Sequence, residues 1–153
     1  MKQIKTNAMR MLERQKIPYK LWEFPTDVKK AAEYLELPPE MIFKTLVTTD
    51  MKEGYFVFCI PVNEELDLKK AAAAAGVKRI EMLKQKDLFP LTGYIHGGCS
   101  PIGMKKMFPT VLDSNVENRE SILVSAGHVG MLMELNPADL IRMVDAATDN
   151  ITK

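Results

Sequence analysis

A change in hydrophobic period after residue 43 is the feature that most constrains the fold. Residues 44–50 (KTLVTTD) and 55–62 (YFVFCIPV) are rich in β-branched and aromatic side chains, and the four residues MKEG join them. Two such runs, separated by a short segment that contains glycine, are typical of an antiparallel β-hairpin. The middle of the chain is therefore expected to carry a β-sheet.

Segments with helical spacing stand on both sides of this hairpin. Asp67 near the start and Gly76 at the stop mark one strong helix, and Asn136 marks the beginning of the last one. Another helix is expected to have Thr26 or Asp27 as its cap. The expected helices span residues 8–15, 28–37, 66–76 and 136–147, with single helical turns at 39–43 and 84–89.

Five further short runs are predicted as strands, and they lie between the helices without strictly alternating with them. They cover residues 19–24, 77–83, 109–114, 121–127 and 131–135. This arrangement favours an α+β fold. No repeat, linker or second domain is visible, so residues 1–153 are expected to form a single domain with a mixed, barrel-like β-sheet flanked by helices.

The composition argues against several classes of protein. No apolar stretch approaches the roughly 18 to 20 residues of a membrane span, and no apolar run follows a basic start as in a signal peptide. Two cysteines, Cys59 and Cys99, are too few for a disulfide framework, so a cytoplasmic location is expected. With 21 basic and 20 acidic residues the formal net charge is only +1, which gives no strong overall field for nucleic acid. Short basic pairs such as Lys105-Lys106 are interpreted as solvated surface.

The segment TGYIHGGCSPIG, from Thr92 to Gly103, interrupts the regular pattern with four glycines. It is not a Walker loop, because no Gly-Lys-Ser/Thr follows, and it is not a nucleophile elbow, because two residues separate Ser100 from the next glycine. Cys99 could form a thiol–imidazole pair with a histidine, although a small cysteine packed in a turn is the simpler interpretation. Gly97 and Gly98 leave backbone groups open to a ligand, unless the segment is only a structural turn.

Two other segments carry candidate residues. Lys44 comes directly before an apolar strand, where a lone lysine is ordinarily a surface residue with a buried stem. The run VSAGHVG contains Ser125 and is ordinarily a hairpin turn. The two histidines, His96 and His128, form no Cys/His spacing typical of a metal site, so no metal and no other cofactor is expected.

The order of these three segments resembles a known family. FKTLV, then TGYxxGGxSPxG, then VSAGxxG, at this spacing, resemble the YbaK/EbsC family of freestanding aminoacyl-tRNA deacylases, which are related to the editing domain of bacterial prolyl-tRNA synthetases. The opening KTNAMRMLERQKIPYKLWEF is similar to the start of YbaK-type members, and the resemblance runs from Thr6 to about Val144. Each motif alone is weak, but the combination is specific.

The resemblance implies an activity and a set of site residues. The activity is hydrolysis of the ester that joins a wrong amino acid to the tRNA 3′ end, with Cys-tRNA(Pro) as the characteristic substrate. Lys44 matches the essential lysine of the family, whereas Cys99 stands where an aliphatic residue is usual and so gains no catalytic role. The implied substrate-binding residues are Thr45, Gly97, Gly98, Ser100 and Ser125.

The chemistry of the ester fits this set of residues. An aminoacyl ester is already activated, so positioning and stabilisation of the developing oxyanion suffice without a protein nucleophile. The backbone of Gly97 and Gly98 is expected to hold the aminoacyl group, and the Lys44 ammonium the ester carbonyl or the terminal phosphate. Water or the substrate's own thiol is then the attacking group. The expected partners are mischarged tRNA and prolyl-tRNA synthetase. Two alternatives stay open: a thiol enzyme that uses Cys99, and a non-catalytic module that recognises tRNA ends or a synthetase.

Overall fold

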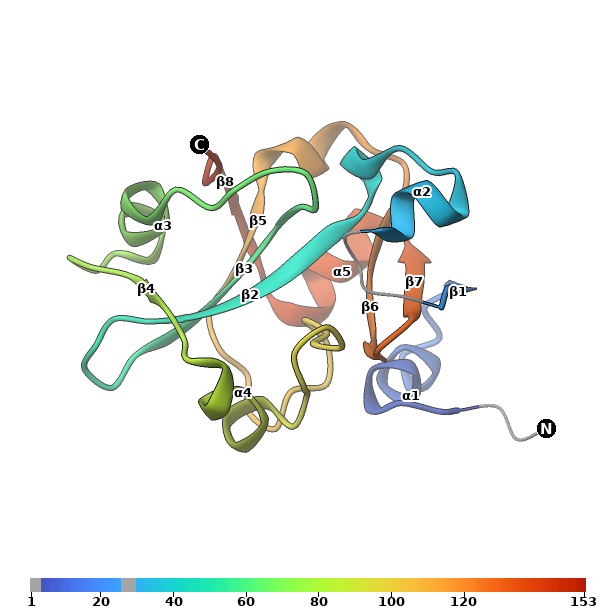
Figure 1. Cartoon of the computed structure of the whole chain (residues 1–153), viewed down its shortest axis with the longest axis horizontal. Helices are drawn as coiled ribbons and strands as arrows, with labels where there is room; N and C mark the ends of the chain where they lie inside the picture. Colours follow the sequence, from blue (N-terminus) through green and yellow to red (C-terminus); the bar gives the residue numbers. More distant parts are fainter. Residues whose placement is uncertain (1–3, 26–29) are drawn as a thin grey trace.

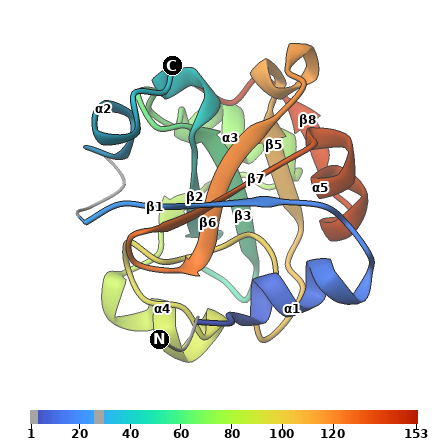
Figure 2. The ribbon, with the colours of Figure 1, turned by 90° about the vertical axis from the view of Figure 1, so that its right-hand side faces the viewer.

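Two β-sheets pack around a common core in the computed structural model, which describes residues 4–25 and 30–153 (Figure 1 and Figure 2). The smaller sheet has the strand order β1-β7-β6 and the larger one the order β4-β2-β3-β5-β8. The strands are β1 (Lys20–Glu23), β2 (Phe43–Thr49), β3 (Tyr55–Pro61), β4 (Glu81–Met82), β5 (Thr110–Asp113), β6 (Ile122–His128), β7 (Met131–Leu135) and β8 (Ala147–Asp149). The helices are α1 (Asn7–Arg14), α2 (Ala31–Leu35), α3 (Leu68–Ala75), α4 (Gln85–Thr92) and α5 (Pro137–Val144), with 3₁₀ turns η2 (Pro39–Met41) and η3 (Ser114–Asn118). None of these helices is long and apolar enough to cross a membrane.

The predicted hairpin is confirmed, and it forms the centre of the larger sheet. β2 and β3 pair antiparallel along their whole length, in a register that sets Val47 opposite Val57. Asp50 closes the connection between them, because its Oδ1 accepts hydrogen bonds from the N–H groups of Lys52 (2.8 Å) and Gly54 (2.9 Å). One carboxylate thus satisfies two donors of the turn at the place where the sequence predicts it.

The larger sheet is mixed, because its last two strands run parallel to their neighbours. β5 lies parallel to β3, and β8 lies parallel to β5. The sequence pattern does not predict β8: it extends the final helix to residue 147, whereas α5 ends at Val144 and Asp145 takes a left-handed φ of 52°. The buried carboxylate of Asp113 accepts a hydrogen bond from the N–H of Ile151 (3.2 Å), so a tertiary contact holds the C-terminal stretch beside the sheet.

Two predicted elements are shorter in the structure. The helix expected over residues 28–37 ends early, because α2 stops at Leu35 and Glu36 takes a left-handed φ of 55°; its expected first residues and its expected caps, Thr26 and Asp27, lie outside the described residues. The strand expected over residues 77–83 is reduced to the two residues of β4, which pair only with the end of β2. Both elements lie at the edge of the packed structure, where the local sequence pattern alone does not determine how long a helix or strand becomes.

One predicted turn is longer in the structure. The turn expected over residues 84–89 is the full helix α4, which continues past Pro90. A proline weakens a helix by removing one N–H donor, but the last turn here gains another bond: the Thr92 hydroxyl donates to the carbonyl of Leu88 (2.8 Å). Gly93, at a φ of 85°, then ends the helix.

The core explains which strand faces are buried. The main cluster joins Phe43 of the larger sheet to Val124 of the smaller one, with side chains of α1 and α5. α3 packs on the opposite face of the larger sheet, and α2 on the outer face of the smaller one. The predicted α+β fold, a single domain with a mixed sheet flanked by helices, is therefore confirmed. An isolated bridge between Ile42 and Leu123 connects the two sheets, and the described strands do not close into a barrel.

Substitution of two glycines with similar backbone conformations tests how much the close packing around Gly130 contributes to stability. Gly130 (φ 82°) and Gly76 (φ 74°) are both left-handed, but a Cβ at Gly130 would lie 2.6 Å from the carbonyl oxygen of Phe24, whereas a Cβ at Gly76 would meet nothing within 4 Å. We expect Gly76→Ala to lower the free energy of unfolding by about 1 kcal/mol, which is the cost of the backbone conformation. Gly130→Ala should lower it by more than about 2 kcal/mol, because the chain at Phe24 must also move. Urea unfolding measures both values, and equal losses would contradict the prediction.

Candidate functional site

Two strand edges face each other where the sheets meet. One edge of β2 pairs with β3, and one edge of β6 pairs with β7. The other edges of β2 and β6 meet at the parallel bridge Ile42–Leu123 (Figure 2). This bridge is isolated, so the ladder between β2 and β6 stops there. We call the residues that follow the bridge on the two strands, Phe43–Thr45 and Val124–Ala126, the β2–β6 junction. The motifs FKTLV and VSAGxxG both begin in it.

The main chain of Thr45 is directed toward this junction. Alternate residues of a strand turn their N–H and C=O groups to opposite edges. The carbonyl of Ile42 accepts from the N–H of Val62 on the β3 side (2.7 Å), whereas the carbonyl of Val47 accepts from the N–H of Leu83 on the other edge (3.0 Å). Thr45 lies two residues before Val47, so its main-chain groups point to the same edge as those of Val47. They therefore point away from β3 and toward the side of β6.

Lys44 and Ser125 share one face of the junction. Each lies two residues beyond the bridged pair Ile42–Leu123, so both lie near the point where β2 and β6 meet. Because side chains alternate, each lies on the same face as its bridged neighbour, and both are partly exposed. The Ser125 Oγ accepts a hydrogen bond from the N–H of Gly127 (3.1 Å), which leaves the hydroxyl hydrogen able to donate. Both side chains therefore extend from the same face of the two strands, close to the bridge.

Two other predicted site residues turn their side chains inward. The Oγ1 of Thr45 lies 3.9 Å from the Sγ of the buried Cys59. Ser100 is fully buried, and its Oγ accepts a hydrogen bond from the N–H of Ile102 (3.2 Å). Because the Ser100 hydroxyl is buried and bonded within the loop, a contribution of Ser100 to substrate binding has to come from the main chain.

The glycine loop approaches the end of β6 at Gly97 and Gly98. A Cβ at Gly98 would lie 3.0 Å from the backbone nitrogen of Val129 and 3.2 Å from the carbonyl carbon of His128. Gly97 has a φ of 85°, and the N–H of Gly98 donates to the carbonyl of Ile95 (3.0 Å). A left-handed backbone at one position and a close approach to the β6–β7 turn at the other both require glycine. The loop is therefore held tightly against the strand that carries the third motif.

Tyr94 holds this loop at a fixed distance from β6, and sequence reasoning missed its role. Its hydroxyl donates to the carbonyl of Ile102 (2.6 Å), and burial raises the pKa of Tyr94 to about 12, so the hydroxyl remains a donor. A Cβ on Gly103 would lie 2.7 Å from the tyrosine oxygen, and a Cβ on Gly127 would lie 2.8 Å from its Cε1. The tyrosine of the TGY motif is thus wedged between two glycines from two motifs, and that conjunction is the signal from which it could have been found.

The start of α1 contacts the same two loops. The Thr6 hydroxyl donates to the carbonyl of Ala126 and accepts from the N–H of Met9, which makes Thr6 the N-cap of the helix. The Asn7 Nδ2 donates to the carbonyl of Gly103 (2.8 Å). These contacts join residues 120 and 96 positions apart, so no local pattern predicts them.

Both cysteines lie inside the molecule. Burial raises the pKa of the Cys59 thiol and of the Cys99 thiol to about 12. For Cys99 the group that acts in the opposite direction is the Thr92 hydroxyl, which is too weak a partner to generate a thiolate. His96 and His128 are both exposed. The geometry around Cys99 therefore fits the simpler interpretation, a cysteine packed in a turn.

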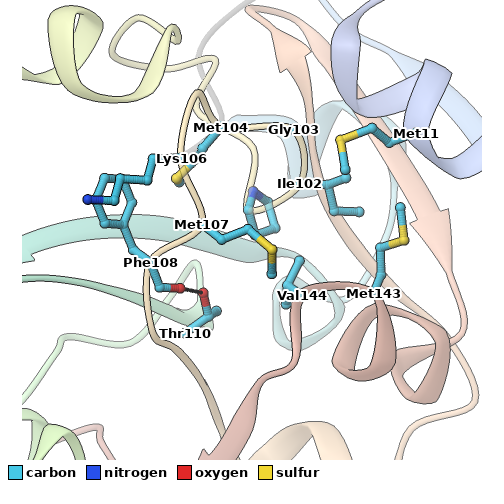
Figure 3. A pocket seen from close by; sticks show the side chains of 11 residues that line it. Met11, Ile102, Gly103, Met104, Lys106, Met107, Phe108, Thr110, Met143 and Val144 are labelled. Atoms are coloured by element: carbon cyan, nitrogen blue, oxygen red, sulfur yellow. Dashed lines mark hydrogen bonds between the residues drawn. The ribbon is translucent and has the colours of Figure 1, made fainter.

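A small apolar hollow lies on the other side of the glycine loop (Figure 3). Its volume is about 40 Å³, which is room for roughly one water-sized group and not for an amino acid. Methionines dominate its walls, which include Met11, Met104, Met107 and Met143. None of the predicted site residues lines this hollow. Among the described residues, no group of three or more His, Cys, Asp or Glu could hold a metal ion.

Known proteins similar in sequence agree with the motifs. Residues 26–143 match the family model described as "Aminoacyl-tRNA editing domain". The chain is 50% identical over 155 residues to the "Putative Cys-tRNA(Pro)/Cys-tRNA(Cys) deacylase EbsC" of Enterococcus faecalis, with 98% of this chain and 94% of that protein covered. It is 29% identical over 103 residues to the proline–tRNA ligase of Shouchella clausii, which covers 67% of this chain but only 18% of the ligase.

Known structures share the fold along the whole chain. A protein described as a "putative trans-editing enzyme for prolyl tRNA synthetase" superposes with a TM-score of 0.87 at 23% identity, over 99% of both chains. The "hypothetical protein APE2540" superposes with a TM-score of 0.88 at 21% identity, over 97% of this chain and 100% of the other. The fold, the family model and the extended similarity to EbsC agree, and the chain therefore belongs to the family of aminoacyl-tRNA editing domains and is of the YbaK/EbsC type.

Proposed function

We propose that this chain, an aminoacyl-tRNA deacylase by its family, is a freestanding trans-editing enzyme that removes cysteine from mischarged tRNA, with Cys-tRNA(Pro) as its main substrate. The observation that carries the proposal is that Lys44 and Ser125 each lie two residues beyond the bridge between β2 and β6 and on the same face, while the loop of Gly97 and Gly98 packs against the end of β6. The name of the half-identical Enterococcus protein supports the choice of substrate.

In this proposal the junction supplies charge and hydrogen bonds rather than a nucleophile. The Lys44 ammonium stabilises the negative charge that develops on the ester carbonyl oxygen, or binds the terminal phosphate. The Ser125 hydroxyl and the main chain of Thr45, Gly97 and Gly98 hold the aminoacyl group in place. An activated ester needs little more, since correct orientation alone can supply several kcal/mol of the barrier.

The attacking group in this mechanism is the thiol of the substrate itself. The cysteinyl sulfur attacks the carbonyl carbon of its own ester, the bond from that carbon to the ribose oxygen breaks, and the thiol proton ends on the ribose oxygen. The first product is a cyclic thioester, which water then opens to cysteine. An intramolecular attack needs no side chain that activates water. Lys44 also favours ionisation of a nearby substrate thiol, because an ammonium stabilises a thiolate.

Editing in trans has a physical reason. A hydrophobic synthetase pocket cannot strongly reject a near-isostere, so that cysteine is accepted in place of proline and a second site must remove it. The formal charge of +1 provides few contacts to the tRNA body, and we therefore include prolyl-tRNA synthetase as the partner that presents the correct tRNA. The activity then belongs in the cytoplasm, where the synthetase charges tRNA.

The decisive experiment is deacylation of a panel of mischarged tRNAs by the purified chain. Turnover of Cys-tRNA(Pro) well above that of correctly charged Pro-tRNA(Pro) is expected. Binding of the panel without any turnover would instead identify the non-catalytic module that recognises tRNA ends.

Lys44→Met removes the ammonium and retains most of the apolar stem. We expect the single-turnover rate with Cys-tRNA(Pro) to fall about 100- to 1,000-fold, the usual effect of losing one group that stabilises an oxyanion. The matched control is Lys78→Met, an exposed lysine after α3, which should keep the wild-type rate. A folded Lys44→Met protein with wild-type turnover would show that the assignment of Lys44 is wrong.

The pH dependence of thiol alkylation tests the role of Cys99. Because burial raises the pKa of both thiols to about 12, the native protein should alkylate slowly at pH 8. The thiolate is the reactive form and its fraction grows about tenfold per pH unit below the pKa, so the alkylation rate should rise through pH 10 without a plateau near the ordinary value of about 8.5. Cys99→Ser should deacylate within about twofold of wild type. A loss as deep as that of Lys44→Met would restore the thiol-enzyme hypothesis.

Substrate analogues test the substrate-thiol mechanism. Single-turnover rates are compared for Cys-, Ser-, Ala- and S-methylcysteinyl-tRNA. Only the free thiol should give fast release, with the cyclic thioester as a trappable first product, because methylation blocks the attack without removing the sulfur. Equal rates for the methylated substrate would identify a bound water as the nucleophile and leave the deacylase assignment in place.

A further inference from the structure

The small positive charge of the chain is concentrated around the glycine loop. Residues 84–107 contain four lysines and one aspartate, a formal charge of +3, whereas the whole chain carries +1. The rest of the chain therefore carries a formal charge of −2. All four lysines of this segment are exposed. The low net charge thus hides a local field of the sign that attracts phosphate.

Three exposed side chains of this segment form one continuous patch. Lys86 and Phe89 lie three residues apart on α4 and so share a face of the helix. The Lys105 Nζ lies 5.3 Å from the centroid of the Phe89 ring, and a Cβ at Gly93 would lie 3.3 Å from the Lys105 Cγ. The Phe89 side chain is 55% exposed. We call Lys86, Phe89 and Lys105 the basic–aromatic patch, in which the Lys105 ammonium lies over the ring of Phe89 and Lys86 lies on the same face of the helix.

The patch continues toward the β2–β6 junction. Ile95 is exposed and precedes Gly97, and the exposed Val129 lies beside the same loop, since its Cγ2 would be 3.7 Å from a Cβ at Gly97. Figure 2 shows α4 and the loop that follows it near the β6–β7 turn, at the lower left of the view. Exposed apolar side chains are ordinarily scattered singly over a surface. Here they lead from the patch to the loop of the proposed site.

We propose that the basic–aromatic patch binds the unpaired 3′ strand of the aminoacyl-tRNA, with a base stacked on Phe89 and the flanking phosphates bound by Lys86 and Lys105. An exposed aromatic ring together with nearby ammonium groups is the combination that binds single-stranded nucleic acid without sequence preference. A duplex presents no base face to such a ring, so the ligand is the single strand and not the acceptor stem. The proposal rests on the proposed function, because it names the part of the substrate that the site must hold.

The test uses the full chain and a fluorescent RNA hairpin with a four-nucleotide unpaired 3′ end, with a blunt hairpin for comparison. Anisotropy titrations at several salt concentrations give the dissociation constant and its salt dependence. Phe89→Ala should weaken binding of the overhang about tenfold, within the range found for loss of one stacked base. Replacement of Lys86 and Lys105 by glutamine should reduce the slope of log K against log salt by about 1.4, at roughly 0.7 for each phosphate contact to a single strand.

Matched variants elsewhere on the surface control for exposure and charge. Tyr34→Ala removes an aromatic ring of α2 that is 59% exposed. Lys69→Gln with Lys78→Gln removes the same charge from the region of α3. Both controls should bind the overhang like wild type. Equal weakening by the controls, or equal binding of the blunt and overhanging hairpins, would overturn the proposal.

Catalysis separates this inference from the proposed function. The patch variants should lower kcat/KM for the cysteinylated hairpin about tenfold and leave that for 3′-O-cysteinyl adenosine, which has no strand, unchanged. Equal losses on both substrates would mean that the patch acts through the fold of the junction, and losses seen only when prolyl-tRNA synthetase is present would make it a protein contact; either result overturns the proposal. A wild-type chain that binds the overhang through the patch but cleaves neither ester would support the patch and refute the proposed function.

Discussion

The packing of Tyr94 between two glycines is the constraint on which the site depends. Its hydroxyl is bonded to the carbonyl of Ile102, and its ring occupies the space that a side chain at Gly103 or Gly127 would need. The glycine loop and the end of β6 come from separate motifs, and within the described part of the chain no β-ladder joins them and sets their distance. Close packing around a rigid ring does so instead, because an interior without voids transmits the position of one loop to the other.

A site built on strand edges suits the chemistry of an activated ester. In the proposed site, strand main chain provides donors and acceptors that need no reorganisation, and the proposed role of Lys44 is to add the charge that the transition state requires. The groups that could have formed a covalent centre are placed elsewhere: Cys99 is buried with a raised pKa, and His128 is exposed at the end of β6. The arrangement fits an enzyme that positions a reactive substrate, and it also explains why composition alone shows so few catalytic parts.

The parts of the fold that sequence predicts well are those fixed by local signals. The hairpin is predicted by its β-branched and aromatic strand segments and by the glycine-containing turn between them. Helix α3 is predicted by its N-cap Asp67 and by Gly76, at which it ends. β8 depends on parallel pairing with β5 and on the bond between the buried Asp113 and a residue 38 positions away, which no window of sequence contains. The site is similar in this respect. Motif resemblance selects Lys44 and Ser125, but only the isolated bridge between β2 and β6 shows that both lie close to the point where these strands meet.

The uneven distribution of charge is consistent with an editing enzyme that must release most of what it meets. Correctly charged tRNA far outnumbers the errors, so tight binding to the common tRNA body would occupy the site with the wrong partners. Affinity that depends on phosphate contacts rises with their number, and a chain with net charge +1 has few outside the segment 84–107. A local field of +3 beside the junction can still guide the 3′ end, since electrostatic attraction acts mainly on the rate of encounter. Discrimination is then left to the junction, where the aminoacyl group itself is examined.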